Sequence, residues 1–322
     1  EYAMLNWVFG RRTGGKKKKV GKRPTYDKAK DIAAGPDVAA RRDLARHEDL
    51  EPELLYFLAN DDASEVRREV AENQGTPLQA DVILATDIDE DVRVELAYKI
   101  GRLAPNLTED ESERLTTLVI EILEILARDE VPRVRAIISE EIKLATTVPQ
   151  RLILRLAEDI EAIVAAPVLE YSPLLSAFDL LEIIAGGAET GSLISLSRRR
   201  GLDEPVVDAV VATKDTDAVV AILENDAADI SEATFDLIAF DAEGRDELHA
   251  PFVNRENLPL RTIKRIATFV SAALVDILIQ RNRLGDEVAG ELRMAVRRRI
   301  DAGDLSADKT DGSPPPDERA QA

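Results

Sequence analysis

The chain has 322 residues, of which 45% are hydrophobic and only 4% aromatic, and its formal net charge is −20. A chain of this length buries a large core and holds one large domain or two ordinary ones. Because it contains no cysteine, disulfides, thiolate metal sites and cysteine nucleophiles are excluded.

The charge is unevenly distributed along the chain. Residues 1–30 carry ten Lys or Arg against two acids, a balance of +8, so residues 31–322 carry −28. Binding to DNA or RNA depends on clustered cations, and an acidic body repels phosphates. We therefore expect no nucleic-acid binding by the body of the protein.

Residues 1–27 form a basic arm that we expect to be disordered. Its apolar patch precedes its cations, which is the reverse of the order in a secretory signal. The residues that define the arm are Trp7, Phe9, Arg11, Arg12, Lys16, Lys17, Lys18 and Lys19. One interpretation is a solvated tail. The other is a peripheral anchor, with the aromatic rings in a membrane interface and the cations on anionic lipid.

Helical periodicity begins near Asp37 and continues to about Ile300. Capping residues separate the short periodic segments, for example Ser231 and the pair Thr108 and Glu111. No run alternates apolar and polar residues over the length of a strand. The fold class that we predict is all-α.

A repeated pattern is the most specific feature of the first half. Leu58-Ala59-x-Asp61 is followed by Val66-Arg67, and two further copies keep this spacing. A fourth copy reaches its valine but has Ala165 in place of the arginine. The repeat residues are Asp61, Val66, Arg67, Asp87, Val92, Arg93, Asp129, Val134, Arg135, Asp159 and Val164.

Each residue of the pattern has an expected role. The aspartate caps or braces a tight turn, and the valine begins the buried face of the next helix. The arginine reaches the aspartate of its own or of a neighbouring repeat. Several copies at one spacing predict an α-solenoid, a stack of helix pairs.

The repeat residues resemble the HEAT repeat, whose second helix commonly opens with Asp followed by Val-Arg. The stretch 164–184 resembles the signature of a bacterial HEAT-like family catalogued as domain of unknown function 2336. The signature residues are Pro167, Glu170, Ser172, Pro173, Ser176 and Asp179. Pieces around Asn225 and Arg255 fit the same family, and the resemblance spans roughly residues 28–280. It implies a helical repeat fold and transfers no catalytic residue.

Local signals within the signature predict helix boundaries. Pro173 suits the first position of a helix, and Ser176 with Asp179 forms a predicted capping box. One interpretation of the stretch is a packing junction between the HEAT-like repeats and the less regular helices that follow. The alternative is a recognition site where Glu170, Tyr171 and Asp179 present polar groups.

The second half departs from the repeat pattern but still predicts helices. We expect HEAT-like repeats over 28–170, a continuous helical region over 171–300 and a disordered Pro- and Asp-rich tail over 301–322. Residues 260–280 are interpreted as one long core helix that closes the solenoid, with a partner-binding or membrane-surface helix as the alternative. The arginines at 293 and 297–299 suit a helix C-terminus, and a basic docking face is the alternative.

No constellation typical of catalysis stands out. Carboxylate pairs carry little information in a chain with 62 acids, and His47 and His249 lie far apart. There is neither a Gly-x-Ser-x-Gly elbow nor a glycine-rich loop between a strand and a helix. We expect no cofactor, no metal and no enzymatic activity.

These observations predict a non-enzymatic scaffold or adaptor in the bacterial cytoplasm, peripheral to the inner membrane if the basic arm binds lipid. The acidic body favours a partner protein with a basic surface or segment. The basic arm could compete for the same surface by folding back. Two other hypotheses remain, namely a lyase- or glycosylase-like enzyme on a HEAT-like fold and a peripheral membrane assembly factor.

Overall fold

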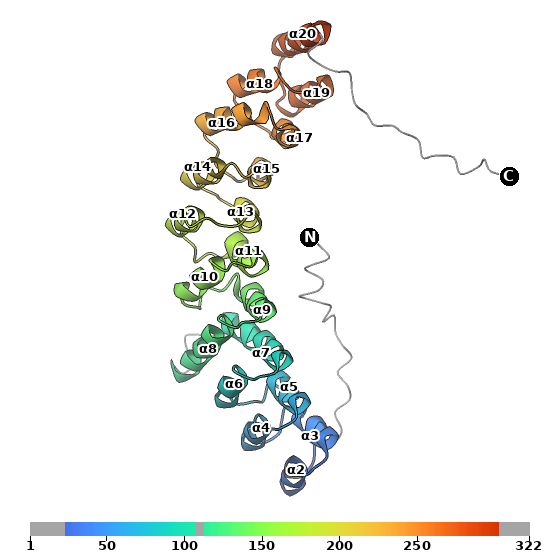
Figure 1. Ribbon diagram of the computed structural model, residues 1–322, viewed down its shortest axis with the longest axis vertical. Coiled ribbons are helices and arrows are strands. Elements are labelled where there is room, and N and C mark those ends of the chain that lie inside the picture. The colour runs from blue at the N-terminus through green and yellow to red at the C-terminus, as the bar shows by residue number, and fades with distance from the viewer. Residues whose placement is uncertain (1–22, 107–112, 303–322) are drawn as a thin grey trace, which may run out of the picture.

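The computed structural model describes residues 23–106 and 113–302, and in these ranges it confirms an all-α solenoid. Helices follow one another without a strand in the described ranges, and they stack in pairs along one axis (Figure 1). Residues 1–22 of the predicted arm, Thr108 with Glu111, and residues 303–322 of the predicted tail lie outside the described ranges. The predicted bounds of both disordered segments, 1–27 and 301–322, are wrong where the structure describes them, because one helix begins at Tyr26 and another ends at Asp301.

Two layers of helices run along the stack. The outer layer consists of α2 (Tyr26–Ala33), α4 (Pro52–Leu58), α6 (Leu78–Leu84), α8 (Glu113–Leu126), α10 (Gln150–Ala157), α12 (Ala177–Ala185), α14 (Glu204–Thr213), α16 (Glu232–Ala242) and α18 (Leu260–Ile266). The inner layer consists of α3 (Val38–Ala45), α5 (Ser64–Glu72), α7 (Glu90–Leu103), α9 (Pro132–Ile142), α11 (Ala162–Tyr171), α13 (Thr190–Ser197), α15 (Thr216–Glu224), α17 (His249–Asn254) and α19 (Ala272–Arg281). Short 3₁₀ turns, η1 (Ala104–Asn106) and η2 (Asp246–Leu248), join neighbouring helices, and α20 (Asp286–Asp301) packs on α19 at the end.

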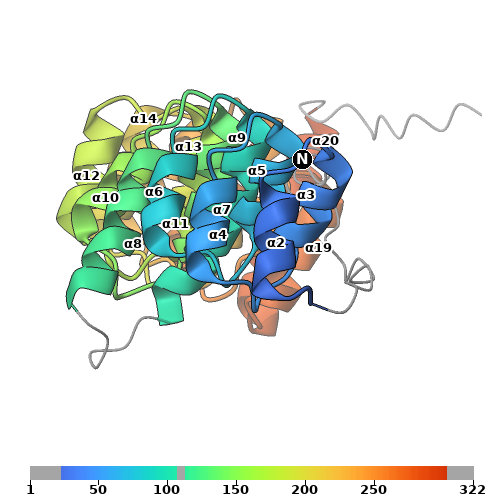
Figure 2. The ribbon, with the colours of Figure 1, turned by 90° about the horizontal axis from the view of Figure 1, so that it is seen from below.

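The stack is bowed, with the inner layer on its concave side (Figure 1). Each inner helix packs on the next inner helix from α3 through to α19. Figure 2 shows the stack from the α2 end, with α2 in front. None of the described helices is both long enough and apolar enough to cross a membrane.

Aliphatic side chains fill the space between the layers. The repeat valines Val66, Val92, Val134 and Val164 lie in the first turn of their inner helices and are fully buried. Burial of one such side chain contributes about 1.5–3 kcal/mol relative to leaving it exposed. The core is therefore continuous along the stack, because each repeat can bury its apolar face only against its neighbours.

The predicted single helix over residues 260–280 is wrong. Two helices, α18 and α19, occupy this range, and residues 267–271 form the turn between them. The Ser271 side chain accepts a hydrogen bond from the backbone N–H of Leu274, so it is the N-cap of α19. The apolar periodicity continues through the turn because both helices bury their faces in the same core.

The junction also differs in detail from its prediction. Pro173 lies in the turn between α11 and α12, so its placement at the first helical position is wrong. Pro167 lies inside α11. The capping box is confirmed, because Ser176 accepts from the N–H of Asp179 while Asp179 accepts from the N–H of Ser176. This box sets the start of α12 four residues beyond Pro173.

Candidate interaction surface

Arginine–aspartate pairs follow one edge of the stack, where outer helices turn into inner ones. Each arginine lies on an inner helix, and each aspartate lies in the corresponding turn of the next repeat. In the described residues the pairs are Arg41–Asp61, Arg67–Asp87, Arg93–Asp129 and Arg135–Asp159, with Nε–Oδ2 distances of 2.5 to 2.6 Å. In every pair Nη2 donates to the other carboxylate oxygen, so the contact is bidentate. We call this row the edge ladder.

Each member of the edge ladder also binds the backbone. Every aspartate accepts from an amide two residues further on, and every arginine donates through Nη1 to a carbonyl six residues earlier. The amides belong to Ala63, Asp89, Val131 and Glu161. The carbonyls belong to Gly35, Asp61, Asp87 and Asp129. The arginine thus contacts the carboxylate of the neighbouring repeat and the backbone of its own turn.

The sequence pattern missed the first rung. Arg41 occupies the arginine position, but Gly35 stands six residues before it, where the later repeats have aspartate. The backbone carbonyl of Gly35 accepts from Arg41 as an aspartate carbonyl does elsewhere. Without the aspartate, only the spacing between Arg41 and Arg67 could have revealed the copy.

The ladder arginines and Asp61 remain ionised. The pKa of Arg67 is raised because its guanidinium donates to Asp87, and the other ladder arginines shift in the same way. Burial opposes ionisation of Asp61, but hydrogen bonds from Arg41 and Ala63 outweigh it and lower the pKa. The ladder arginines therefore join neighbouring repeats as permanent cations, and these contacts already occupy their guanidinium groups.

The edge ladder ends at α11 because both members of the next pair are absent. Ala165 replaces the arginine and is fully buried. Gly187 stands three residues before α13, the position that Asp159 has before α11, and its φ of +85° favours glycine. The position therefore has neither the guanidinium group nor the carboxylate that forms the pair in the other repeats.

A second row of contacts continues at the C-terminal ends of the inner helices. Here side chains bind main-chain carbonyls of the preceding repeat. Arg199 donates to the carbonyls of Leu169, Ser172 and Leu175. Asn225 donates to those of Ser197 and Arg199. Arg255 donates to those of Ile222, Leu223, Asn225 and Ala228. We call this row the carbonyl ladder.

The carbonyl ladder overlaps the edge ladder at α11. Asp159 supports the entry to this helix, while Leu169 and Ser172 at its end accept from Arg199. In the first half, Asn73 already binds the carbonyls of Ala45 and His47 in the same manner. The geometry favours the packing junction, because α11 is where one kind of inter-repeat contact gives way to the other.

The polar residues proposed for a recognition site at the junction separate in space. Asp179 lies on α12 in the outer layer and accepts from Gln150 at 3.0 Å. Glu170 and Tyr171 end the inner helix α11, and Tyr171 is half exposed. Lys143 Nζ lies 4.6 Å from the centroid of the Tyr171 ring. Only Glu170 and Tyr171 therefore belong to the inner surface.

Polar pairs connect successive inner helices, and Glu95 is the one carboxylate among them that is buried. The cross-helix pairs are Arg46–Glu69, Arg68–Glu95 at 3.0 Å, Arg102–Glu141 at 3.2 Å and Lys143–Tyr171. Arg102 also lies over the Tyr98 ring, 5.3 Å from its centroid. We call these residues, with Glu170, the concave network. It offers carboxylates and two tyrosine rings along α3–α11.

Both tyrosines of the concave network stay protonated at neutral pH. Burial is the main cause of the raised pKa of Tyr98. A hydrogen bond with Glu170 is the main cause of the raised pKa of Tyr171. Their hydroxyl groups are therefore hydrogen-bond donors, and their ring faces attract cations.

The sequence from residue 31 to residue 302 has two regions of opposite net charge. Residues 31–254 carry twenty Lys or Arg against forty-nine Asp or Glu, a net −29. Residues 255–302 carry ten basic against six acidic residues, a net +4. The concave network lies wholly in the acidic region.

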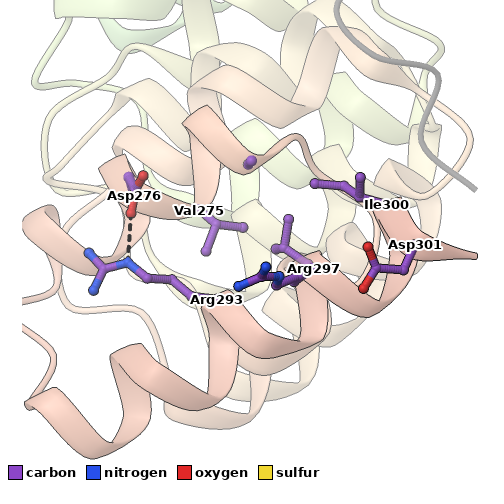
Figure 3. Close-up of a pocket in the computed structure, with 8 residues that line it drawn as sticks. Val275, Asp276, Arg293, Arg297, Ile300 and Asp301 are labelled. Carbon is purple, nitrogen blue, oxygen red and sulfur yellow. Dashed lines mark hydrogen bonds and ion pairs between the residues drawn. The ribbon is translucent and has the colours of Figure 1, made fainter.

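A groove of about 390 Å³ lies in the basic region, between α19 and α20 (Figure 3). Arg293 and Arg297 line it, and Arg293 pairs with Asp276 at 3.0 Å. Arg299, by contrast, donates to the carbonyls of Ala267, Phe269 and Val270 in the turn that follows α18. The arginines of α20 therefore divide between an internal contact and the rim of an open groove.

His249 contacts a backbone carbonyl and an aromatic ring. His249 Nε2 lies 2.7 Å from the carbonyl oxygen of Ala242, and its ring packs on Phe269. His249 and Tyr171 lie on different helices, α17 and α11. In the described ranges, no group of three or more His, Asp or Glu side chains is placed to hold a metal.

Comparison with known protein families gives a match for only part of the chain. Residues 164–321 match a family described as an uncharacterised protein conserved in bacteria (DUF2336). The match begins at Val164, within α11, where the carbonyl ladder takes over from the edge ladder. It extends further along the chain than the resemblance over 28–280 and begins later. No curated protein matches the chain.

Proposed function

We propose that the protein is a non-enzymatic scaffold that binds a basic segment of another protein along its concave surface. The concave network carries this proposal, because it presents tyrosine rings and carboxylates on the inner layer of an extended acidic stack. Extended concave surfaces of this kind are the binding surfaces of solenoid proteins.

The chemistry of the network suits a cationic partner. Lys143 on the Tyr171 ring and Arg102 on the Tyr98 ring are cation–π contacts within the chain. A lysine or arginine of a partner can contact the half-exposed Tyr171 ring in the same way and pair with Glu170. Tyrosine and arginine are also the residue types that dominate binding energy at interfaces.

We further propose that the whole described stack is a HEAT-like array within the matched bacterial family. The edge ladder supports this for the first half, since its aspartate, valine and arginine recur at one spacing on stacked helix pairs. The second half supports it by continuing the same two layers without interruption from α11 to α19.

The test compares matched variants of the two surfaces. The concave variant is Glu170→Lys with Tyr171→Ala, and the control is Glu182→Lys with Phe178→Ala on the outer helix α12, where both residues are exposed. Partners are identified by crosslinking in cells of the source bacterium, and their affinities are then measured by calorimetry. A nonapeptide of alternating arginine and leucine serves as a chemical probe.

We expect the concave variant to bind the partner and the probe at least about tenfold more weakly, which corresponds to about 1.4 kcal/mol. The control should bind like the unaltered chain, and raising the salt concentration should weaken binding. Equal affinities of the two variants would show that the concave network is not the binding surface.

A further inference from the structure

A groove next to the first outer helices combines aromatic rings with carboxylates. Its volume is about 760 Å³, and it lies between the α2–α3 turn and α4. Tyr56 and Phe57 form its aromatic wall and are 44% and 55% exposed. Glu53, Asp61 and Asp62 supply its carboxylates. We call it the α4 groove.

Two of these carboxylates are open to a ligand. Asp61 is held by Arg41 in the edge ladder. Glu53 and Asp62 are exposed, and no described basic side chain pairs with either of them. Glu53, Tyr56 and Phe57 recur at helical spacing, so the acid and the rings share one face of α4. Such a face favours an extended cationic segment.

The basic arm leaves the described structure near the N-terminal end of α4. Arg23, the first described residue, pairs with Glu51 and lies 3.7 Å from Asp49. Glu51 directly precedes α4, so the arm is anchored at the start of the helix whose face lines the groove. Residues 1–22 carry seven Lys or Arg against Glu1.

The length of the arm suits the groove. From Glu51 to Asn60 at the far end of the groove, a helical rise of 1.5 Å per residue gives about 14 Å. An extended segment advances about 3.3 Å per residue, so Lys16 to Lys19 reach about 13–23 Å from Arg23. These are maximal reaches, so all four lysines can lie within the groove when the arm is less than fully extended.

We propose that Lys16–Lys19 of the basic arm dock in the α4 groove of the same chain. The ammonium groups lie on the Tyr56 and Phe57 rings and pair with Glu53 and Asp62. Because the contact is intramolecular, its effective concentration is of millimolar order. The docked arm is withheld from other anionic surfaces until salt or a competing basic segment releases it. The contact does not depend on the concave network.

The absence of cysteine allows a direct test in the full chain. Lys18→Cys combined with Asn60→Cys reports docking through a short bismaleimide crosslink, and the same cysteine pair with Glu53→Gln, Asp62→Asn and Phe57→Ala added is the control. We expect the intramolecular crosslink yield with the unaltered groove to exceed that of the control by about tenfold at low salt. This excess should disappear at high salt. Equal yields in the two proteins would overturn the proposal.

Trp7 supplies a second readout because it is the only tryptophan of the chain. We expect its fluorescence anisotropy to exceed that of a free peptide of residues 1–22, and to drop by at least half in the Tyr56→Ala, Phe57→Ala variant. The matched control is Phe178→Ala, which removes an exposed aromatic ring from α12. Circular dichroism verifies that each variant is folded. An unchanged anisotropy in a folded groove variant would overturn the proposal.

Discussion

Lys99 and Asp81 form an ion pair inside the first half of the solenoid. Lys99 Nζ lies 2.6 Å from Asp81 Oδ1 and 3.2 Å from the carbonyl oxygen of Asn73. Both side chains are almost fully buried, and Asp81 Oδ2 has no hydrogen-bond partner. Burial raises the pKa of Asp81 to about 6 and lowers that of Lys99. The pair joins α6 to α7 at a high desolvation cost.

Removing one member of this pair should destabilise the fold strongly. Lys99→Met leaves the Asp81 carboxylate buried without its cation, and we expect a loss of about 3–5 kcal/mol in the free energy of unfolding at pH 7. The double variant Asp81→Leu, Lys99→Met leaves no buried charge and should lose less than Lys99→Met. Urea unfolding measures both. A double variant as unstable as the single one would contradict this account.

The same pair should make stability depend on pH. The folded-state pKa of Asp81, about 6, lies above its ordinary value of 3.8, so the folded chain binds this proton more tightly. Its contribution is fully present below about pH 4 and is lost as the pH rises through 6. We expect the stability of the unaltered chain relative to Asp81→Asn to fall by roughly 2–3 kcal/mol from pH 4 to pH 7. Unfolding curves at these pH values measure it, and a constant difference would contradict the assignment.

At the scale of elements, the edge ladder fixes how one inner helix sits against the next turn. Arg93 is the most buried arginine of the ladder, and its fork spans the Asp129 carboxylate and the Asp87 carbonyl. The geometry requires a planar donor with several N–H groups. The ladder therefore fixes the register between neighbouring repeats in addition to contributing the electrostatic attraction between arginine and aspartate.

A positive charge at position 93 should not be enough to replace the contacts of the Arg93 guanidinium. Arg93→Lys keeps the cation but loses the fork, so we expect it to lower the free energy of unfolding by about 1.5–3 kcal/mol. Arg93→Ala leaves Asp129 unpaired and should cost about 3–5 kcal/mol. Arg151→Lys is the control, because that arginine is largely exposed. A lysine variant as stable as the unaltered chain would contradict the bidentate role.

The carbonyl ladder should respond in the same way in the second half. Arg255 donates to four backbone carbonyls, and burial lowers its pKa. Arg255→Met leaves these carbonyls without their charged donor, and we expect a loss of about 2–4 kcal/mol. The exposed Arg261→Met is the matched control. Urea unfolding distinguishes them, and equal stabilities would show that Arg255 is dispensable.

At the scale of the whole molecule, each repeat contacts only its neighbours, so disturbances should stay local. The edge ladder holds the first half and the carbonyl ladder holds the second, with α11 in both. A change in one ladder should therefore loosen the helices nearest to it and spare the distant end of the stack.

Hydrogen exchange measures this locality. Arg93→Ala should reduce amide protection in α5 to α9 and leave α15 to α19 unchanged, whereas Arg255→Met should do the reverse. The physical reason is that solenoid stability is nearly a sum of repeat and neighbour terms. Uniform loss of protection along the chain in either variant would instead indicate a single cooperative unit.

The sequence alone determined the helical class, the stack of helix pairs and the capping box of Ser176 and Asp179. These features depend on periodicity and on contacts within a few residues. Only the tertiary structure decided which aspartate each arginine binds. The partners lie 20 residues apart for Arg67–Asp87 but 36 apart for Arg93–Asp129. Loop length changes this spacing without changing the contact.

The carbonyl ladder and the concave network were also decided by tertiary structure. Main-chain carbonyls have no signature in a sequence, so nothing marked Arg255 as the donor to four of them. Tyr98 and Tyr171 lie far apart in the chain and share a surface only because α7, α9 and α11 stack. Periodicity specifies which face of each helix is buried, whereas stacking decides which exposed side chains meet.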